Sequence, residues 1–386
     1  MKRLCKDVDI TDRGLISRAV YACLDKKYKR NDTARYMAQV SGLTESQVKC
    51  IHARYGKRAL YWITEKIIDN IRKELIQRKV SFPEIWYREK IDGSSGKVRR
   101  IGIQNIKQQL YDYIAVEGLK PFLKRIGEYQ FASIKGRGPL KGKQVISRWI
   151  QDKSIRYFVK LDVRKCFESI DHGKLMKFLK RHIKNDTLLE LVQMLVNSFE
   201  KGLSIGSYLS QFLCNLYMSI VYHGIKENMY RIRRRKNTLA VRQNYVKRCL
   251  IYMDDVLLLG MRKADLKKAV QLTISKAAEM GLEIKPHHQI CNIDKFCIDM
   301  MGYKIYRSHT GIRGRVFLRV RRAFKKALRH KKIPLQLAKL CISRYGSIKS
   351  TNSRHITYKW KIRQTIKQCK GVIRNESKIR AAAVAC

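Results

Sequence analysis

Acidic residues are scarce in this sequence. Its 386 residues include 31 aspartates and glutamates against 84 lysines and arginines, and the formal net charge is +53. Self-repulsion of this size disfavours a compact chain unless a polyanion screens it, so we expect a nucleic-acid partner. The alternative is a cationic protein on a membrane surface, but the basic residues are spread along the whole chain and form no single amphipathic basic helix.

Long hydrophobic runs are absent as well. No stretch of roughly 18 apolar residues occurs, which excludes a membrane-spanning helix, and the first residues, MKRLCKDVDI, lack the apolar core of a signal peptide. We therefore expect no membrane partner and a cytoplasmic location. Hydrophobic residues still make up 45% of the chain, enough for a packed core in two or three units.

Paired cysteines are missing although the chain has 11 of them. No CxxC pair occurs and the count is odd, so neither a zinc site nor a disulfide framework is expected. We therefore interpret the cysteines as buried or free thiols in a reducing compartment.

The hydrophobic pattern divides the chain into parts. Residues 1–80 show helical periodicity, with Leu60, Ile63, Ile67 and Ile71 on one face. Within them, ARYMAQVSGLTESQVKCI predicts two helices joined by a glycine turn, the second of which begins with a Thr-x-x-Gln capping box. This helix pair either binds DNA as a helix-turn-helix or only packs within the helical segment. Residues 81–306 mix short β-branched runs with helices, and residues 307–386 are helical. We predict an α+β protein.

Basic residues gather beside glycines and near the C-terminus. Two such segments are GKVRRIGI and SIKGRGPLKGK, the second of which contains Lys135 and Arg137. Glycines beside cations let the backbone approach phosphate groups, but the same pattern also occurs in solvated hairpin turns, so both interpretations stay open. From residue 301 onward there are 24 lysines and arginines and one acid, Glu376. A basic stripe in this region comprises Arg313, Arg315, Arg319, Arg321, Arg322, Lys325, Lys326 and Arg329. It predicts a surface that binds along a phosphate backbone; the alternative is a solvated helix face.

The few carboxylates sit at informative positions. In RYFVKLDVRKCF a strand delivers Asp162 to its far end, and RCLIYMDDVLLLG predicts a β-hairpin with Asp254 and Asp255 at its tip. Adjacent carboxylates repel each other unless a cation is bound or the turn is simply solvated. Magnesium prefers oxygen ligands, and two such ions support in-line nucleotidyl transfer.

FVKLDVRKCF followed by YMDD resembles the palm of a reverse transcriptase, and further blocks of that family occur in order: GKVRRIGI, FASIKGRGPLKG, SIGSYLSQFLCN, MGLEIKPHHQI and MMGYKIY. The resemblance implies a right-hand polymerase. Its parts would be an N-terminal helical extension (1–80), fingers (81–150), a palm with an antiparallel sheet and helices on one face (151–306) and a basic helical thumb (307–386).

The resemblance also assigns roles. Asp162, Asp254 and Asp255 match the catalytic triad that binds two Mg²⁺ ions, for which Mn²⁺ can substitute, with the carbonyl of Val163 completing the shell. Phe167 matches the aromatic gate that excludes a ribose 2′ hydroxyl. Residues implied to contact the deoxynucleotide are Lys97, Arg99, Phe167, Ile205, Gly206, Gln211, Tyr252, Met253 and His288, and those implied to form the primer grip are Met301, Gly302 and Tyr303.

Two departures from the common family pattern stand out. Most reverse transcriptases have glutamine where this chain has Ile205, and the IGxxxSQ pattern resembles the enzymes of diversity-generating retroelements. An isoleucine cannot donate the hydrogen bond that glutamine gives, which predicts lower fidelity; the alternative is that Ile205 only packs the pocket. His288 stands where many relatives have lysine, and either protonates pyrophosphate or is a surface histidine.

We therefore expect an RNA-directed DNA polymerase of a diversity-generating retroelement, in the group II intron-like bacterial superfamily. Such an enzyme, encoded by a bacterium or phage, copies a template-repeat RNA into cDNA with errors at adenines, which diversifies the variable repeat of a target gene. The family implies template RNA, the RNA/cDNA hybrid, deoxynucleoside triphosphates and a basic helical-bundle accessory variability determinant as partners. A retron, group II intron or abortive-infection enzyme, or a non-catalytic RNA-binding protein, remains an alternative.

Overall fold

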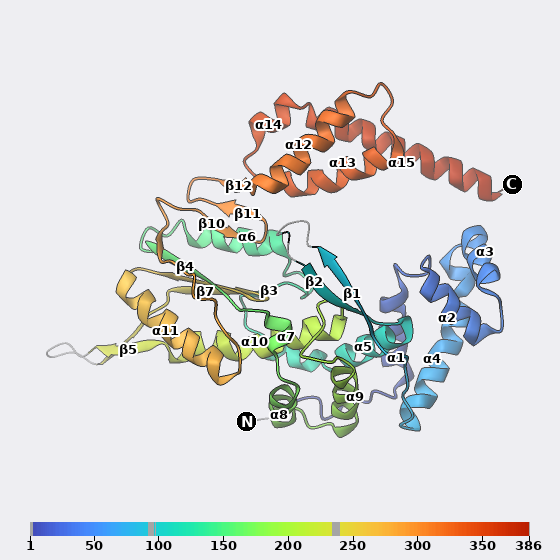
Figure 1. The fold of residues 1–386 in the computed structure, drawn as a ribbon, viewed down its shortest axis with the longest axis horizontal. Coiled ribbons are helices and arrows are strands. Elements are labelled where there is room, and N and C mark those ends of the chain that lie inside the picture. Colours follow the sequence, from blue (N-terminus) through green and yellow to red (C-terminus); the bar gives the residue numbers. More distant parts are fainter. Residues whose placement is uncertain (1–2, 92–95, 97, 234–239, 386) are drawn as a thin grey trace. The chain divides into compact units, whose positions relative to one another are not determined.

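The computed structural model describes residues 3–91, 96, 98–233 and 240–385. The fold combines helices and strands, as the α+β prediction requires. The chain forms two compact units (Figure 1). Unit 1 comprises residues 1–133, 162–225 and 272–286, and unit 2 comprises residues 134–161, 226–271 and 287–386.

Unit 1 begins with helices, as the periodicity of the first 80 residues predicts: α1 Arg13–Leu24, α2 Asn31–Ser41, α3 Glu45–Tyr55, a 3₁₀ turn Lys57–Leu60 and α4 Tyr61–Ile76. Ile63, Ile67 and Ile71 of α4 are fully buried. Gly42 ends α2 in the left-handed conformation, and the Thr44 hydroxyl and Gln47 side chain form the predicted capping box of α3. The local signals in this segment are thus confirmed.

The remaining elements of unit 1 are β1 Trp86–Ile91, β2 Val98–Ile103, α5 Ile106–Gly118, a 3₁₀ turn Lys120–Arg125, β3 Gln130–Phe131, α7 Cys166–Ser169, α8 His172–His182, α9 Asp186–Asn197 and α10 Tyr208–Asn228, whose last three residues belong to unit 2. Strands β1 and β2 form an antiparallel hairpin. Helix α5 packs against α1, α2 and α9, so the N-terminal helices share a core with the segment that follows them. Most of α10 is buried.

Unit 2 contains the main sheet. Its strands β7 Arg248–Tyr252, β8 Asp255–Gly260, β4 Tyr157–Asp162 and β9 Cys291–Asn292 lie in that order, and β7–β8 and β4–β9 pair antiparallel. The chain passes from unit 2 to unit 1 at Asp162, the last residue of β4. Further elements are α6 Pro139–Trp149, β5 Tyr230–Arg233, β6 Val241–Asn244 and α11 Lys263–Glu279, which crosses from unit 2 into unit 1.

The C-terminal part of unit 2 is a small sheet followed by a helical cluster (Figure 1). The strands are β10 Ile298–Met300, β11 Tyr303–Ile305 and β12 Thr310–Ile312; the helices are α12 Gly314–Leu328, α13 Leu335–Ile348, α14 Arg354–Lys359 and α15 Ile362–Ala385. Val320, Ala323, Phe324 and Ala327 return at helical spacing on α12 and are buried against α13 and α15. Helix α6 packs on β11.

Two further observations concern membrane crossing and disulfides within the described residues. None of their helices combines the length and the hydropathy that a membrane crossing requires. No disulfide forms among the cysteines that the structure describes.

Candidate functional site

The predicted acidic hairpin is present. Tyr252 pairs with Asp255 across a two-residue turn of Met253 and Asp254. Leu250 and Ile251 on β7 and residues 256–259 on β8 are fully buried, so the polar groups of the hairpin are concentrated at its tip. Met253 has φ 53°, a conformation that favours glycine, so the turn is strained where it presents the carboxylates. Burial, then the charges of Asp255 and Asp254, raises the pKa of Tyr252.

Strand β4 lies beside β8 in the sheet of unit 2. Val159 and Leu161 are fully buried on β4, whereas Lys160 points to the other face. The Lys160 ammonium lies 2.9 Å from the Asp255 carboxylate, and both side chains are largely buried. Because alternate strand residues share a face, Asp162 projects from the same face of β4 as Lys160.

Asp162 lies in a second antiparallel pairing, within unit 1. The Lys285 amide donates to the Asp162 carbonyl at 2.9 Å, and Val163 and Ile284 form the bridge between them. The next hydrogen bond of this pairing runs from the Arg164 amide to the Glu283 carbonyl. The Val163 carbonyl therefore accepts no hydrogen bond from the paired strand. The Lys285 ammonium also forms an ion pair with the Asp162 carboxylate.

The carboxylates have the chemistry of a divalent-cation site, although the described residues contain no group of three or more His, Cys, Asp or Glu side chains that could hold a metal ion. Aspartate oxygens are the ligands that Mg²⁺ prefers. The Oδ1 atom of Asp162 is buried, and its charged partner is the Lys285 ammonium. Lys160 beside Asp255 and Lys285 beside Asp162 supply positive charge that a bound cation would replace, so the carboxylate donor set fits a cation.

The segment containing Ile205 packs against the β1–β2 hairpin within unit 1. A Cβ at Gly206 would lie 3.2 Å from the Gly102 carbonyl, which shows how closely the two backbones approach. The Gln211 amide donates to the Ile205 carbonyl at 3.4 Å, and the Ser133 hydroxyl donates to Gln211 Oε1 at 2.5 Å. Gln211 therefore joins the Ile205 backbone to Ser133, near the start of the FASIKGRG block.

Ile205 lines a cavity of about 230 Å³. The β2 hairpin supplies Arg100, whose guanidinium pairs with both carboxylate oxygens of Glu200 at 2.8 and 3.1 Å and stacks 4.0 Å from the Tyr87 ring. Its neighbour Arg99 is exposed, and Lys97 lies outside the described residues. The sequence interpretation named Arg99 and overlooked Arg100, because only the structure reveals Glu200 opposite it.

A buried carboxylate fixes the chain just after Ile205. Asp112 of α5 is almost fully buried and accepts a hydrogen bond of 2.6 Å from the Ser207 hydroxyl, directly before α10. Burial raises the pKa of Asp112 to about 6, and the Ser207 hydrogen bond opposes that shift. The sequence interpretation missed Asp112, since nothing in its local pattern distinguishes it from an exposed helical acid.

Phe167, the predicted sugar gate, lies on the short helix α7 and is partly buried. The Leu203 amide donates to its carbonyl at 2.8 Å. Gly202 packs so closely that an added Cβ would lie 2.5 Å from the same carbonyl oxygen. The segment before Ile205 is therefore fixed against the residues that follow Asp162.

The predicted primer-grip residues form the turn of the β10–β11 hairpin. Met300 pairs with Tyr303, and the two turn residues Met301 and Gly302 have φ values of 56° and 86°. Positive φ at both positions is typical of a tight hairpin turn. The Lys143 ammonium lies 6.0 Å from the centre of the Tyr303 ring.

The predicted phosphate-binding residues occupy two places in unit 2. Lys135 is exposed and Arg137 partly exposed in the turn before α6. Residues 315–326 of the basic stripe lie on α12, opposite its buried face. Arg313 precedes α12 and forms an ion pair with Asp299.

The cation in contact with Asp162 is Lys285 and not a histidine. His288 is partly buried in the loop before β9, and its role in proton transfer stays a prediction. Lys285 lies in the same MGLEIKPHHQI block, and Lys160 lies two residues before Asp162. The alternation of β4 was a signal for Lys160, but the ion pair itself depends on a neighbouring strand.

Comparison with known proteins identifies the family. The family model "Reverse transcriptase (RNA-dependent DNA polymerase)" matches residues 88–305, more than half of the chain. The chain belongs to the reverse transcriptase family. Residues 88–305 are an RNA-directed DNA polymerase domain, a nucleotidyltransferase domain, and this range contains most of the β1–β2 hairpin, Asp162, the acidic hairpin and Tyr303.

Two similar proteins come from Saccharomyces cerevisiae. The "Putative COX1/OXI3 intron 1 protein" is 32% identical over 87 residues, covering 19% of this chain and 10% of the yeast protein. The "Putative COX1/OXI3 intron 2 protein" is 26% identical over 146 residues, covering 34% of this chain and 16% of the yeast protein. The match thus spans about a tenth and about a sixth of the length of these relatives.

Proposed function

We propose that the protein copies an RNA template into DNA. The observation that carries this proposal is the pair of strand-end carboxylates, Asp162 and Asp255, each beside a lysine ammonium in a domain of the reverse transcriptase family. Asp162, Asp254 and Asp255, with the Val163 carbonyl, would hold two Mg²⁺ ions. When bound, these ions would activate the primer hydroxyl and neutralise the leaving pyrophosphate.

The neighbouring residues would bind the deoxynucleoside triphosphate. Phe167 excludes a ribose 2′ hydroxyl, and Arg99 neutralises the triphosphate together with Lys97. His288 protonates the pyrophosphate as it leaves. Further contacts to the nucleotide come from the IGxxxSQ segment and from the acidic hairpin: Ile205, Gly206, Gln211, Tyr252 and Met253.

Nucleic acid would follow the basic surfaces. In this proposal residues 81–150 act as fingers, 151–306 as the palm and 307–386 as the thumb, after a helical extension of residues 1–80. Met301, Gly302 and Tyr303 hold the primer, while Lys135 and Arg137 contact the template. The RNA/cDNA hybrid lies against the stripe that includes Arg315, Arg319, Arg321, Arg322, Lys325 and Lys326, with Arg313 at its start.

The biological role proposed here is mutagenic copying in a diversity-generating retroelement. It rests on the IGxxxSQ segment, in which the apolar Ile205 lines a cavity beside Arg100. The cDNA of a template repeat would carry errors at adenines and diversify a variable repeat. A basic helical-bundle accessory variability determinant would be the protein partner, in the cytoplasm of a bacterium or phage-infected cell.

The test is to sequence cDNA made by the purified protein on an RNA template rich in all four bases, with Mg²⁺ and deoxynucleotides, with and without the candidate accessory protein. Errors concentrated opposite template adenines support the retroelement role. Accurate cDNA, or errors spread evenly over the four template bases, contradicts that role and leaves the polymerase itself in place.

A second candidate is an intron-encoded reverse transcriptase. It is favoured by the similarity to two yeast proteins whose names assign them to introns. The same sequencing experiment separates the candidates, because an intron enzyme copies its RNA without an adenine-specific error pattern. A template repeat and variable repeat beside the gene would favour the retroelement.

A further inference from the structure

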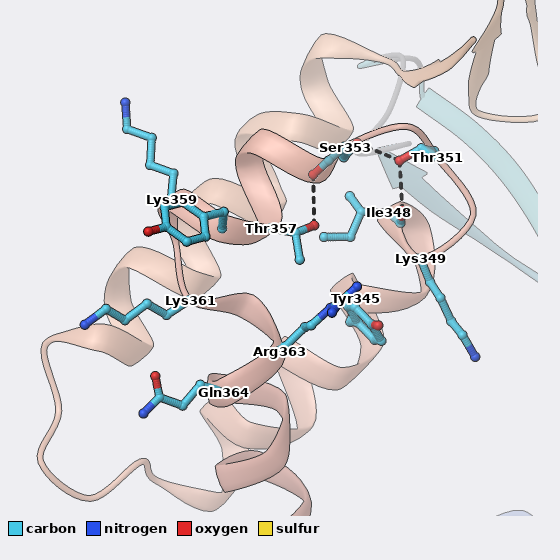
Figure 2. Close-up of a pocket in the computed structure, with 11 residues that line it drawn as sticks. Tyr345, Ile348, Lys349, Thr351, Ser353, Thr357, Lys359, Lys361, Arg363 and Gln364 are labelled. Carbon is cyan, nitrogen blue, oxygen red and sulfur yellow. Dashed lines mark hydrogen bonds between the residues drawn. The ribbon is translucent and has the colours of Figure 1, made fainter.

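The C-terminal helices enclose a cavity of about 800 Å³ that no predicted role uses (Figure 2). The end of α13, the loop of residues 349–353, α14 and the start of α15 form its wall. Its volume lies within the range of about 300–1,000 Å³ that is common for small-molecule sites. A site of this size holds a nucleotide.

The wall of this cavity is cationic. Lys349, Lys359, Lys361 and Arg363 line it, and the chain from residue 301 onward has a single acid, Glu376. Four cationic side chains on one wall favour an anion such as a phosphate. Lysine and arginine are the usual partners of phosphate oxygens.

The wall is also held in place by hydrogen bonds (Figure 2). The Thr351 hydroxyl donates to the Ile348 carbonyl at 2.8 Å and lies 2.6 Å from the Ser353 hydroxyl. The Thr357 hydroxyl donates to the Ser353 carbonyl at 2.9 Å. These bonds join the loop to α13 and α14, so the cavity exists before any ligand enters and little ordering is needed on binding.

Aromatic rings complete the wall. Tyr358 lines the cavity and is 88% exposed, and Tyr345 lies partly buried on α13. An exposed ring beside cations is the arrangement on which unpaired bases stack while their phosphates are neutralised. Bases within a duplex are already stacked on their neighbours, so such a ring favours a single strand.

The junction of α14 and α15 is strained at the same place. Lys361, which lines the cavity between the two helices, has φ 44°, a left-handed conformation that residues other than glycine rarely adopt. Strain of this kind is often retained at ligand sites. It fixes the direction in which Lys361 leaves the backbone.

The cavity loop is joined to the proposed primer grip within unit 2. Asn352 exchanges two hydrogen bonds with Thr310 of β12, at 2.8 and 2.9 Å. The Lys143 ammonium donates to the Ser350 carbonyl at 3.0 Å and also lies over the Tyr303 ring. A strand held in the cavity would therefore be held by the same unit that bears Tyr303.

We propose that this cavity binds one nucleotide of a single-stranded polynucleotide, with its phosphate beside Lys359 and Lys361 (Figure 2) and its base stacked on Tyr358. The inference rests on the proposed function, because a reverse transcriptase that copies RNA works on a single-stranded RNA template. The site then holds unpaired template outside the hybrid.

The test measures equilibrium binding of a short fluorescent single-stranded RNA to the full-length protein without deoxynucleotides. A DNA strand of the same sequence and a blunt RNA duplex serve as parallel probes. Tyr358→Ala should weaken single-strand binding about tenfold and leave duplex binding unchanged. Tyr358→Phe, which keeps the ring, should restore binding.

The cations are tested by the salt dependence of binding. Lys359→Ala with Lys361→Ala should reduce the slope of log K against log salt by about 0.7 for each phosphate that is no longer neutralised. Lys331→Ala with Lys332→Ala removes the same charge from exposed positions outside the cavity. This control should change the slope less.

Several results would overturn the inference: unchanged single-strand binding by Tyr358→Ala, an equal loss of duplex binding, or an equal change of slope in the control variant. Displacement of RNA by free deoxynucleotides from the wild type but not from Tyr358→Ala would show a free-nucleotide site and also overturn it. Equal binding of the RNA and DNA strands supports a site for either strand, and preference for RNA supports a template site. Failure of the wild type to make cDNA would contradict the proposed function separately, because binding is measured without synthesis.

Discussion

The ammonium group of Lys285 forms an ion pair with the carboxylate of Asp162, and the Lys285 amide donates to the Asp162 carbonyl at 2.9 Å. The two residues are far apart in the sequence and belong to different predicted motifs. The pairing therefore joins the proposed metal-binding strand to the MGLEIK segment. A metal ion that binds Asp162 must displace the Lys285 ammonium.

Replacing Lys285 by methionine should lower the Mg²⁺ concentration that half-saturates DNA synthesis. The ion pair opposes metal binding, and its side chains are about one-third exposed, so solvent limits its strength to about 0.2–1 kcal/mol. The expected fall is up to about fivefold. Lys276→Met, which removes an exposed pair with Glu279 instead, is the control and should leave the Mg²⁺ dependence unchanged. An unchanged or higher Mg²⁺ requirement in Lys285→Met would contradict this explanation.

Replacing Ile205 by glutamine should raise copying fidelity several-fold, because the new amide supplies a hydrogen bond worth about 1 kcal/mol near the incoming nucleotide. The cavity beside Ile205 gives the longer side chain space. Ile205→Leu keeps the position apolar and should retain the wild-type errors. Sequencing the cDNA measures both, and an error spectrum that does not change in Ile205→Gln would refute the role of Ile205.

Asp112 predicts a specific pH dependence of stability. Its pKa in the folded protein, about 6, lies above the ordinary value of 3.8, so the folded state binds the proton more tightly than the unfolded state. As the pH rises from about 3 to 7, this residue should lower the free energy of unfolding by up to about 3 kcal/mol, mostly between about pH 4 and 6, with little further change above about pH 7.

Asp112→Asn removes that contribution. Urea unfolding at a series of pH values should give a wild-type minus variant difference that falls between pH 4 and 6. Asp7→Asn changes an exposed acid and is the control. A difference between wild type and Asp112→Asn that does not vary over this range would show that Asp112 is not the buried acid described here.

Arg307 should be important for the stability of unit 2. Its guanidinium pairs with Asp294 and donates to the carbonyls of Ile150 and, at 3.0 Å, Ile155. Arg307→Ala leaves these largely buried acceptors without a donor, so we expect a loss of about 3 kcal/mol in the free energy of unfolding. Arg321→Ala, at an exposed position of α12, should change it by less than about 0.5 kcal/mol. Equal effects of the two substitutions in urea unfolding would contradict this assignment.

The parts of the fold that the sequence predicts are those that depend on local patterns. The capping box of Thr44 and Gln47, the strand that ends at Asp162 and the hairpin around Asp254 and Asp255 each depend on residues within one short segment. Their periodicity and turn chemistry are visible in the sequence. The structure confirms all three elements.

The partners of these residues depend on tertiary structure. The ion pairs of Lys285 and Lys160, the Glu200 carboxylate opposite Arg100 and the buried Asp112 join segments that are distant in the sequence. Strand order and helix packing bring such groups together, and no periodicity within one segment reveals them. The cavity in the C-terminal helices was missed for the same reason.

The central claim is most directly tested by primer extension on an RNA template with Mg²⁺ and deoxynucleotides. The wild type should make cDNA, and Asp254→Ala with Asp255→Ala should reduce the rate by about a thousandfold or more, because the metal ligands are removed. Glu84→Ala with Glu128→Ala removes two exposed acids and should retain the wild-type rate. Template-dependent cDNA that is made equally well without Asp254 and Asp255 would contradict the account.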